Sequence, residues 1–221
     1  MELNKIFNCD CLELMKTLPD KCIDLVCCDP PYGMGFNSGY RTIKHDKIIN
    51  DDNLEWLPEY LQQCKRILKE DAHSYFFCST HFVDIFVSEI KKYLPYKNIL
   101  IWEKNNTGMG DLFGDYAPKY EFIIFCSNGE KKLNGGRDAN IIKGKRTTNE
   151  LHPTQKPVSL ISYLIEKSTK EGDIVFDGFL GSGTTAVSAQ ELYRKYIGCE
   201  LDKDYFEIAE KRLGFIKQRL F

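Results

Sequence analysis

Short apolar runs alternate with amphipathic segments along this chain of 221 residues, and this alternation restricts the folds open to it. The apolar runs, such as 23–28, 121–126 and 196–199, have the length of buried strands. Between such runs, segments such as 82–90 and 206–216 repeat apolar residues every three or four positions, which predicts helices. Strands alternating with helices are typical of a parallel sheet covered on both faces. We therefore expect an α/β fold with a mostly parallel sheet and helices on both faces, in one domain over residues 1–221.

Two boundaries in the first half of the chain are expected from turn and cap signals. Asp51-Asp52-Asn53 is suited to cap a helix, because short polar side chains accept bonds from free helical N–H groups. The inner face of that helix is expected to extend to Leu68, and the next strand to cover 74–78.

The composition is that of an ordinary soluble globular protein, with 43% hydrophobic and 28% charged residues. No apolar run approaches the ~18 residues needed to span a membrane, and the first residues lack the pattern of a signal peptide. Most of the nine cysteines lie in or beside apolar runs, and none has the two-residue gap of a zinc site. We expect a reducing, cytoplasmic location and no metal.

The segment Asp29-Pro30-Pro31-Tyr32 directly follows the apolar run 23–28. Two adjacent prolines fix two φ angles and remove two N–H donors, so the chain leaves a strand on a stiff corner rich in acceptors. The Asp29 carboxylate and the backbone carbonyls are suited to accept hydrogens from an amino group on a flat ring, which Tyr32 can cover. A plain proline turn with a capping aspartate is the alternative.

A glycine-rich loop, Gly181-Ser182-Gly183, follows the apolar strand expected at 173–176 and opens a helix. Glycines allow close approach of a ligand, and a helix N-terminus offers free N–H groups to an anion. Glu200 follows the next strand, 17 residues after Gly183, where an acid can accept bonds from ribose hydroxyls. This arrangement predicts a ligand that contains a nucleoside.

The formal net charge of −2 conceals a basic segment at 128–151. Between residues 131 and 146 it carries six basic residues and one acidic residue, a local charge of +5, which suits phosphate binding. Its basic residues are Lys131, Lys132, Arg137, Lys143, Lys145 and Arg146. Arg41, Lys44 and Lys47 are candidates for a second DNA surface, and plain solvated loops are the alternative for both regions.

The combination of these motifs resembles the amino-methyltransferases that use S-adenosylmethionine to methylate exocyclic amines in DNA. Asp29 to Tyr32 is similar to their catalytic motif, and Phe179-Leu180-Gly181-Ser182-Gly183 to their cofactor motif. The catalytic motif precedes the cofactor motif, as in the permuted beta group. The segment 152–157 resembles the one that this group carries before its cofactor motif. Gly178 departs from the proline of many relatives, and the basic segment is shorter than their target-recognition region.

The resemblance implies a Rossmann-like fold, a flipped base in double-stranded DNA as substrate, and a role for each motif residue. The implied catalytic residues are Asp29, Pro30, Pro31 and Tyr32, with Tyr32 stacked on the base. Asp10 is implied to contact the adenine of the cofactor, and Lys156 its methionine carboxylate. The other implied cofactor-binding residues are Asp177, Phe179, Gly181, Ser182, Gly183, Thr184, Thr185 and Glu200.

An aspartate at the first position of the catalytic motif favours adenine N6 as the target. Cytosine N4, a non-catalytic DNA-binding module on the same fold and a small-molecule methyltransferase are the alternatives. Relatives are often dimers, so a homodimer is a further expectation.

Overall fold

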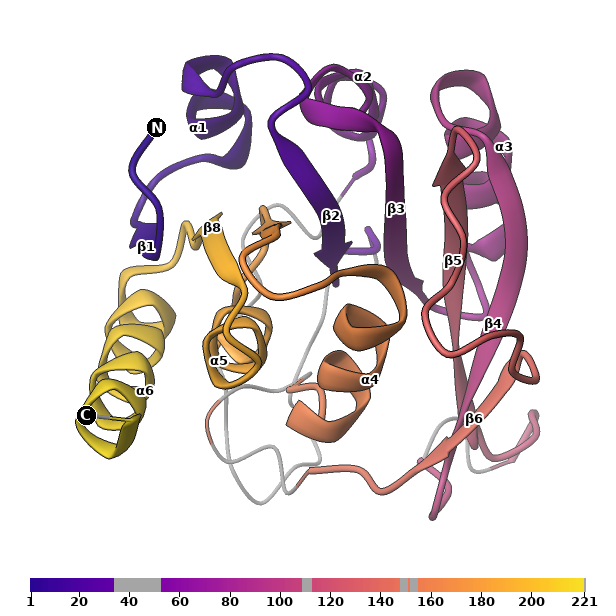
Figure 1. Cartoon of the computed structure of the whole chain (residues 1–221). Coiled ribbons are helices and arrows are strands. Elements are labelled where there is room, and N and C mark those ends of the chain that lie inside the picture. Colours follow the sequence, from indigo (N-terminus) through magenta and orange to yellow (C-terminus); the bar gives the residue numbers. More distant parts are fainter. Residues whose placement is uncertain (34–52, 109–112, 148–150, 152–154, 221) are drawn as a thin grey trace.

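The computed structural model describes residues 1–33, 53–108, 113–147, 151 and 155–220, with side chains as far as 216. An eight-stranded sheet with the order β1-β8-β7-β2-β3-β5-β4-β6 forms its centre (Figure 1). The strands are β1 (Lys5–Phe7), β2 (Ile23–Cys28), β3 (Leu68–Cys78), β4 (Tyr96–Lys104), β5 (Tyr120–Asn128), β6 (Ile141–Gly144), β7 (Ile174–Asp177) and β8 (Lys195–Cys199). The helices are α1 (Cys11–Thr17), α2 (Leu57–Ile67), α3 (Val83–Tyr93), α4 (Val158–Ser168), α5 (Thr184–Glu191) and α6 (Lys203–Leu220).

Within this sheet, β5 runs antiparallel to both of its neighbours, and every other adjacent pair is parallel. The expectation of a mostly parallel sheet is therefore confirmed. Seven strands end at one edge of the sheet, which we call the carboxyl edge; the opposite edge is the amino edge. Because β5 is reversed, it begins at the carboxyl edge and ends at the amino edge.

Helices cover both faces of the sheet, as the alternating pattern predicts. One hydrophobic cluster joins α1, α2 and α3 to the sheet, and a second joins α4, α5 and α6 to the other face. Alternate residues of β2 supply both: Val26 and Cys28 enter the first cluster, and Leu25 and Cys27 the second. Every residue of β2 is buried, which is the reason that its sequence is almost entirely apolar.

Two boundaries differ from the sequence prediction. Strand β3 begins at Leu68 rather than at residue 74, so Leu68 does not belong to the preceding helix. Lys69 donates to Asp24 on β2, and Asn128 of β5 donates to the Lys69 carbonyl at 2.7 Å, so neighbouring strands extend β3 through polar residues. Helix α2 begins at Leu57 with Trp56 at its N-cap and no side-chain cap. Of the expected cap, Asp51 and Asp52 lie outside the described residues, and Asn53 accepts from the Glu55 N–H at 3.0 Å ahead of the helix.

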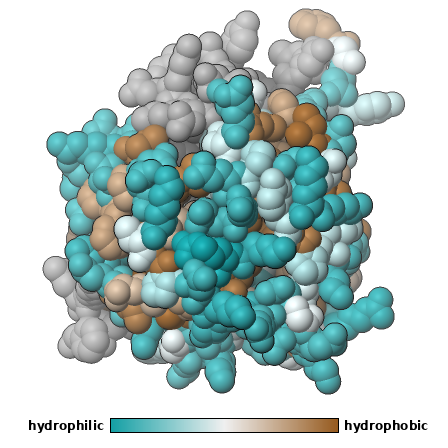
Figure 2. Space-filling model, turned by 90° about the horizontal axis from the view of Figure 1, so that it is seen from above, coloured by the Kyte–Doolittle hydropathy of each residue, from teal (hydrophilic) through white to brown (hydrophobic). Residues whose placement is uncertain are grey.

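Seen from above, where α1 and α2 are uppermost in Figure 1, the surface is mostly hydrophilic with scattered hydrophobic residues (Figure 2). Among the helices of the described residues, none is both long and apolar enough to span a membrane.

Candidate functional site

The two motifs singled out in the sequence meet at the centre of the carboxyl edge. Strand β2, which precedes Asp29, pairs directly with β7, which ends at Asp177. From β2 the chain crosses through α2 to β3 on one side, and from β7 it crosses through α5 to β8 on the other. Ligands of open α/β sheets bind where the strand order reverses in this way. The fold therefore places the acidic corner and the glycine loop at a single ligand-binding position.

Asp29 is held from two directions. The Tyr32 hydroxyl donates to its Oδ1 atom and the Lys156 ammonium to its Oδ2 atom. Burial raises the pKa of the Asp29 carboxyl, while Lys156 opposes that rise. A carboxylate offers about four lone-pair sites, and these two bonds occupy two of them. Asp29 therefore keeps acceptor capacity for an amino group of a substrate.

Tyr32 is half-buried, and its ring meets the edge of Phe86 with the centroids 6.1 Å apart. Its hydroxyl bond to Asp29 fixes the ring beside the carboxylate.

A row of alternating charges extends from Asp29 across the sheet. Lys156 Nζ lies 3.4 Å from Glu121 Oε2, and Glu121 Oε1 lies 2.6 Å from Lys104 Nζ. We call Asp29, Lys156, Glu121 and Lys104 the charge row. Both lysines are buried, at 7% and 8% exposure for Lys156 and Lys104. Buried charges need such partners, because an isolated ion away from water is costly.

The charges of this row keep one another ionised. Burial alone would lower the pKa of Lys156, but Asp29 and Glu121 hold it above its ordinary value. Burial alone would raise the pKa of Glu121, but Lys156 and Lys104 hold it below its ordinary value. The lysines also contact aromatic faces: Lys156 Nζ is 5.0 Å from the centroid of Phe77, and Lys104 Nζ is 5.4 Å from that of Trp102.

Around the glycine loop, two acids bind the backbone. Asp177 accepts from the Phe179 N–H at 2.9 Å, and Glu200 accepts from the Gly181 N–H at 2.7 Å. Burial raises the pKa of Asp177 to about 7, against hydrogen bonds from the Thr185 hydroxyl and the Phe179 backbone that lower it. Burial also raises the pKa of Glu200. These bonds show how the predicted acids shape the loop.

Gly183 is required at its position for two reasons. Its φ is +83°, in the left-handed region, and an added Cβ would lie 2.7 Å from the Cβ of Ala209. Gly178 is enclosed as well, because a Cβ there would lie 3.0 Å from the Tyr60 ring and 3.1 Å from Cys11 Cβ. Glycine at 178 is thus fitted to its neighbours.

An aromatic cluster borders the loop. The centroid of Phe179 lies 5.1 Å from that of Trp56 and 5.0 Å from that of Tyr60. Phe179 and Trp56 are partly exposed, whereas Tyr60 is buried. The exposed parts of these two rings provide an apolar surface suited to a flat ligand.

Arg212 on α6 binds the glycine loop through three hydrogen bonds. Its guanidinium donates to the Ser182 carbonyl, to Ser182 Oγ at 3.1 Å and to Thr184 Oγ1 at 3.3 Å. Burial lowers the pKa of this arginine. Sequence reasoning missed it, because one arginine in a charged C-terminal helix gives no signal of a distant loop.

Asp10 is the N-cap of α1, where its carboxylate accepts from the Leu12 N–H at 2.8 Å. The same segment reaches the site, since Asn8 donates to the Glu200 carbonyl at 2.9 Å. The structure therefore supports the cap role of Asp10 and brings Asn8 of the same segment to Glu200; contact of Asp10 with a cofactor stays a prediction.

The structure separates the residues of the basic segment into two groups. Lys131 and Lys132 follow the end of β5 and lie at the amino edge, away from Asp29. Arg137 follows Gly136, whose carbonyl accepts from Lys167 near the end of α4. The other residues lie on β6 or directly after it, toward the carboxyl edge. We call them the second basic group: Lys143, Lys145 and Arg146. Arg41, Lys44 and Lys47 lie outside the described residues.

His73 has a structural environment. Its Nδ1 lies 2.9 Å from Ser168 Oγ, its Nε2 lies 3.2 Å from the Lys131 carbonyl, and burial lowers its pKa to about 4. Among the described residues, no group of three or more histidine, cysteine, aspartate or glutamate side chains is placed to hold a metal ion.

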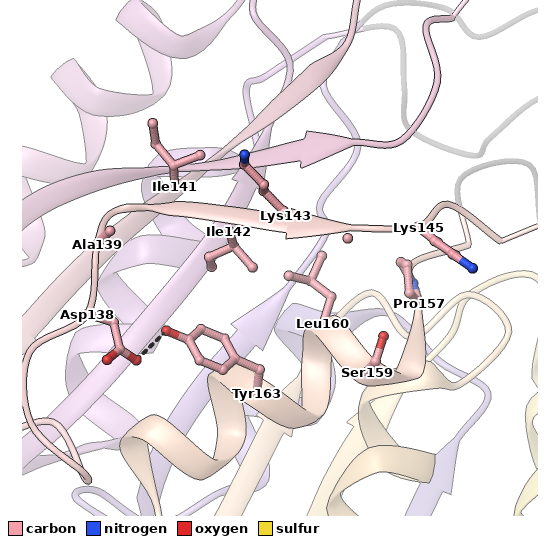
Figure 3. A pocket seen from close by; sticks show the side chains of 11 residues that line it. Asp138, Ala139, Ile141, Ile142, Lys143, Lys145, Pro157, Ser159, Leu160 and Tyr163 are labelled. Atoms are coloured by element: carbon pink, nitrogen blue, oxygen red, sulfur yellow. Dashed lines mark hydrogen bonds between the residues drawn. The ribbon is translucent and has the colours of Figure 1, made fainter.

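A pocket of about 380 Å3 lies between β6 and α4 (Figure 3). Ile142 and Leu160 face each other across it, and Asp138 accepts from the Tyr163 hydroxyl at 2.8 Å at one end. Lys145 stands at the other end, near Pro157. Because Pro157 follows Lys156 directly, the pocket adjoins the site and is bordered by the second basic group.

Comparison with known proteins agrees with this geometry: the chain belongs to the DNA methylase family, whose sequence profile matches residues 23–211. It is 32% identical to the Type II methyltransferase M.HinfI of Haemophilus influenzae, over 97% of this chain and 69% of that protein. It is 30% identical to the Type II methyltransferase M.HpaI of Haemophilus parainfluenzae, over 91% of this chain and 71% of that protein. The DNA adenine methyltransferase YhdJ of Escherichia coli (strain K12) is 27% identical, over 96% and 83%.

Solved structures give the same result. The complex of M1.HpyAVI with SAM matches with a TM-score of 0.74 at 25% identity, over 95% of this chain and 98% of that chain. A PvuII DNA methyltransferase described as cytosine-N4-specific matches with a TM-score of 0.76 at 18% identity, over 94% and 85%, and shares the fold. The predicted methyltransferase fold and the predicted family of DNA amino-methyltransferases are thus confirmed.

Proposed function

We propose that this chain transfers a methyl group from S-adenosylmethionine to the exocyclic N6 atom of an adenine in double-stranded DNA. The observation that carries the proposal is the Asp29 carboxylate, which Lys156 and Tyr32 hold beside the glycine loop at the reversal of strand order. We also propose that residues 1–221 act as one methyltransferase domain. A homodimer stays a prediction.

In this proposal, Asp29 acts as a hydrogen-bond acceptor for the amine. The exocyclic nitrogen is a poor nucleophile because its lone pair is delocalised into the ring. Asp29 and the Pro30 carbonyl accept its two hydrogens and so favour a more pyramidal nitrogen. S-adenosylmethionine would supply the methyl group from its positively charged sulfur and leave as a neutral thioether, and the proton that the methylated amine releases would pass to the Asp29 carboxylate that accepts its hydrogen bond. Orientation of the reacting atoms contributes much of the remaining rate.

The cofactor seat in the proposal is the loop from Asp177 to Thr185 with Glu200. The partly exposed rings of Phe179 and Trp56 suit a flat base, and the Glu200 carboxylate suits ribose hydroxyls. Lys156 was predicted to meet the methionine carboxylate. Since its ammonium is bound to Asp29 and Glu121, we propose instead that it serves the acceptor.

The DNA surface in the proposal is the second basic group, because this one of the two described groups lies toward the edge that carries Asp29. To test it, two exposed charges are removed in Lys143→Ala/Lys145→Ala. The matched control is Lys132→Ala/Arg137→Ala, which removes two exposed charges of the same basic segment that lie away from the carboxyl edge. The first variant should bind DNA more weakly and reduce the slope of log K against log salt by about 2, whereas the control should keep both. Equal effects of the two variants would remove β6 from the DNA surface.

Adenine is favoured by the aspartate at the start of the motif and by the resemblance to YhdJ, named a DNA adenine methyltransferase. Cytosine N4 is the second candidate, since the PvuII enzyme shares the fold. The test is incubation of the protein with S-adenosylmethionine and DNA, followed by digestion and mass spectrometry of the nucleosides. We expect N6-methyladenine; N4-methylcytosine would overturn the target, and no methylated nucleoside would overturn the reaction.

A further inference from the structure

Glu121 is the one member of the charge row that comes from a reversed strand. As the second residue of β5, it reaches the carboxyl edge because β5 begins there. Its two carboxylate oxygens face two different lysines, Lys104 at 2.6 Å and Lys156 at 3.4 Å. Glu121 therefore connects the acceptor site with Lys104 on β4, which lies three strands beyond β2.

The contacts within the charge row indicate which residue holds which in place. A lysine ammonium has three donors on a flexible stem, so one carboxylate does not fix its position. Asp29 binds Lys156 from one side and Glu121 lies on another, while Lys104 fixes Glu121 in turn. Lys104 is also packed against the Trp102 ring. The four charges alternate and sum to zero, so each member is placed by the next.

We propose that Glu121 is a positioning residue for methyl transfer: it holds the Lys156 ammonium against Asp29 and so fixes the orientation and the charge of the acceptor. The inference rests on the proposed function, and it names a residue beyond the two motifs. Glu121 does not touch the substrate in this proposal, and it acts through Lys156.

A purely structural role for Glu121, as the partner of two buried lysines, is the competing explanation. The two differ in their effect on Asp29. Glu121 raises the pKa of Asp29 by charge repulsion, and the lysines keep Glu121 itself ionised. If Lys156 keeps its position without Glu121, the pKa of Asp29 should therefore fall. If Glu121 holds Lys156 against Asp29, loss of the ammonium, which lowers the pKa of Asp29 more strongly than Glu121 raises it, should instead raise that pKa. The ionisable groups that interact with Asp29 are Tyr32, Lys156, Glu121, Cys27, Cys78 and Asp177.

The experiment compares wild type with Glu121→Gln, which keeps the shape of the side chain and removes its charge. Single-turnover methyl transfer to DNA is measured between pH 4 and pH 9. We expect a loss of rate on the order of tenfold or more, because small displacements of positioned groups are costly. We also expect the acidic limb of the profile to move to higher pH, because a displaced Lys156 no longer lowers the pKa of Asp29. Glu103→Gln, on the neighbouring strand, is the matched control and should keep the wild-type profile.

A second variant separates positioning from stability. The double variant Glu121→Gln/Lys104→Met also removes Lys104, which Glu121→Gln alone leaves buried without its carboxylate. The midpoint of urea unfolding should therefore recover toward wild type. The low rate of methyl transfer and the displaced acidic limb of the pH profile should remain. Recovery of rate and stability together would assign Glu121 a structural role only. Wild-type rate and profile in Glu121→Gln would also overturn the inference.

A titration of the Asp29 carboxyl carbon by NMR, in wild type and Glu121→Gln, needs no substrate. A higher pKa of Asp29 in the variant supports the positioning of Lys156 even if wild type transfers no methyl group, in which case the proposed function alone fails. A lower or an unchanged pKa overturns the inference.

Discussion

The buried carboxyl of Asp177 should make the stability of this protein depend on pH in an unusual direction. Its pKa is raised by burial from 3.8 to about 7. The folded protein therefore holds a proton that the unfolded chain releases above pH 4. Stability from this group is fully present below about pH 4 and is lost as pH rises through 7. Asp177→Asn, which cannot ionise and keeps an acceptor for the Phe179 N–H, should lack this loss.

The size of the effect follows from the same pKa. A rise of about three pKa units at 1.36 kcal/mol per unit means that ionisation of Asp177 destabilises the folded state by about 4 kcal/mol at high pH. Part of this is already lost at pH 5, where the unfolded chain is largely ionised. Between pH 5 and pH 8 the Asn variant should therefore gain about 2 to 3 kcal/mol relative to wild type.

The assay is urea unfolding under reducing conditions at several pH values between 5 and 8. Thr185→Val provides a second arm, since the Thr185 hydroxyl lowers the pKa of Asp177. Its removal should move the region of stability loss to higher pH. A constant difference in free energy of unfolding between wild type and Asp177→Asn across this range would refute the reasoning.

Three further substitutions test the site directly. Asp29→Ala should lower single-turnover methyl transfer by at least about 100-fold while S-adenosylmethionine binding, measured by calorimetry, largely survives; near wild-type transfer would exclude the acceptor role. Glu200→Ala removes the acceptor of the Gly181 N–H and should weaken S-adenosylmethionine binding, so an unchanged affinity would remove Glu200 from the cofactor seat. Arg212→Met leaves the Ser182 carbonyl without this donor and should lower the free energy of unfolding by about 1–3 kcal/mol, which urea unfolding checks.

The sequence was sufficient for the two motifs and for the alternation of strands and helices, because both depend on local patterns. The Pro-Pro corner marks the end of a strand wherever that strand lies, and Gly183 needs its left-handed φ independently of distant residues. The order of the strands was beyond the sequence, because antiparallel β5 between β3 and β4 is fixed by long-range pairing.

This missing order also hid part of the site. Glu121 and Lys104 were each visible as a charge beside an apolar run, but nothing local relates them to Asp29. Glu121 and Lys104 come close to Asp29 because the first residues of β5 lie at the carboxyl edge. Trp56 was hidden for a similar reason, since its contact with Phe179 joins two segments more than 100 residues apart.

The antiparallel pairing of β4 and β5 has a consequence for the order of folding. These strands are consecutive in the chain, so their pairing closes only the short connection 105–119, whereas β2 and β7 are brought together from far apart. Short loops lose less entropy on closure. We expect the Lys104–Glu121 ion pair to form early with this hairpin, before Lys156 and Asp29 join it. The two members of the charge row that are most distant from Asp29 would thus be in place first, and Lys156 and Asp29 would pack against them later in folding.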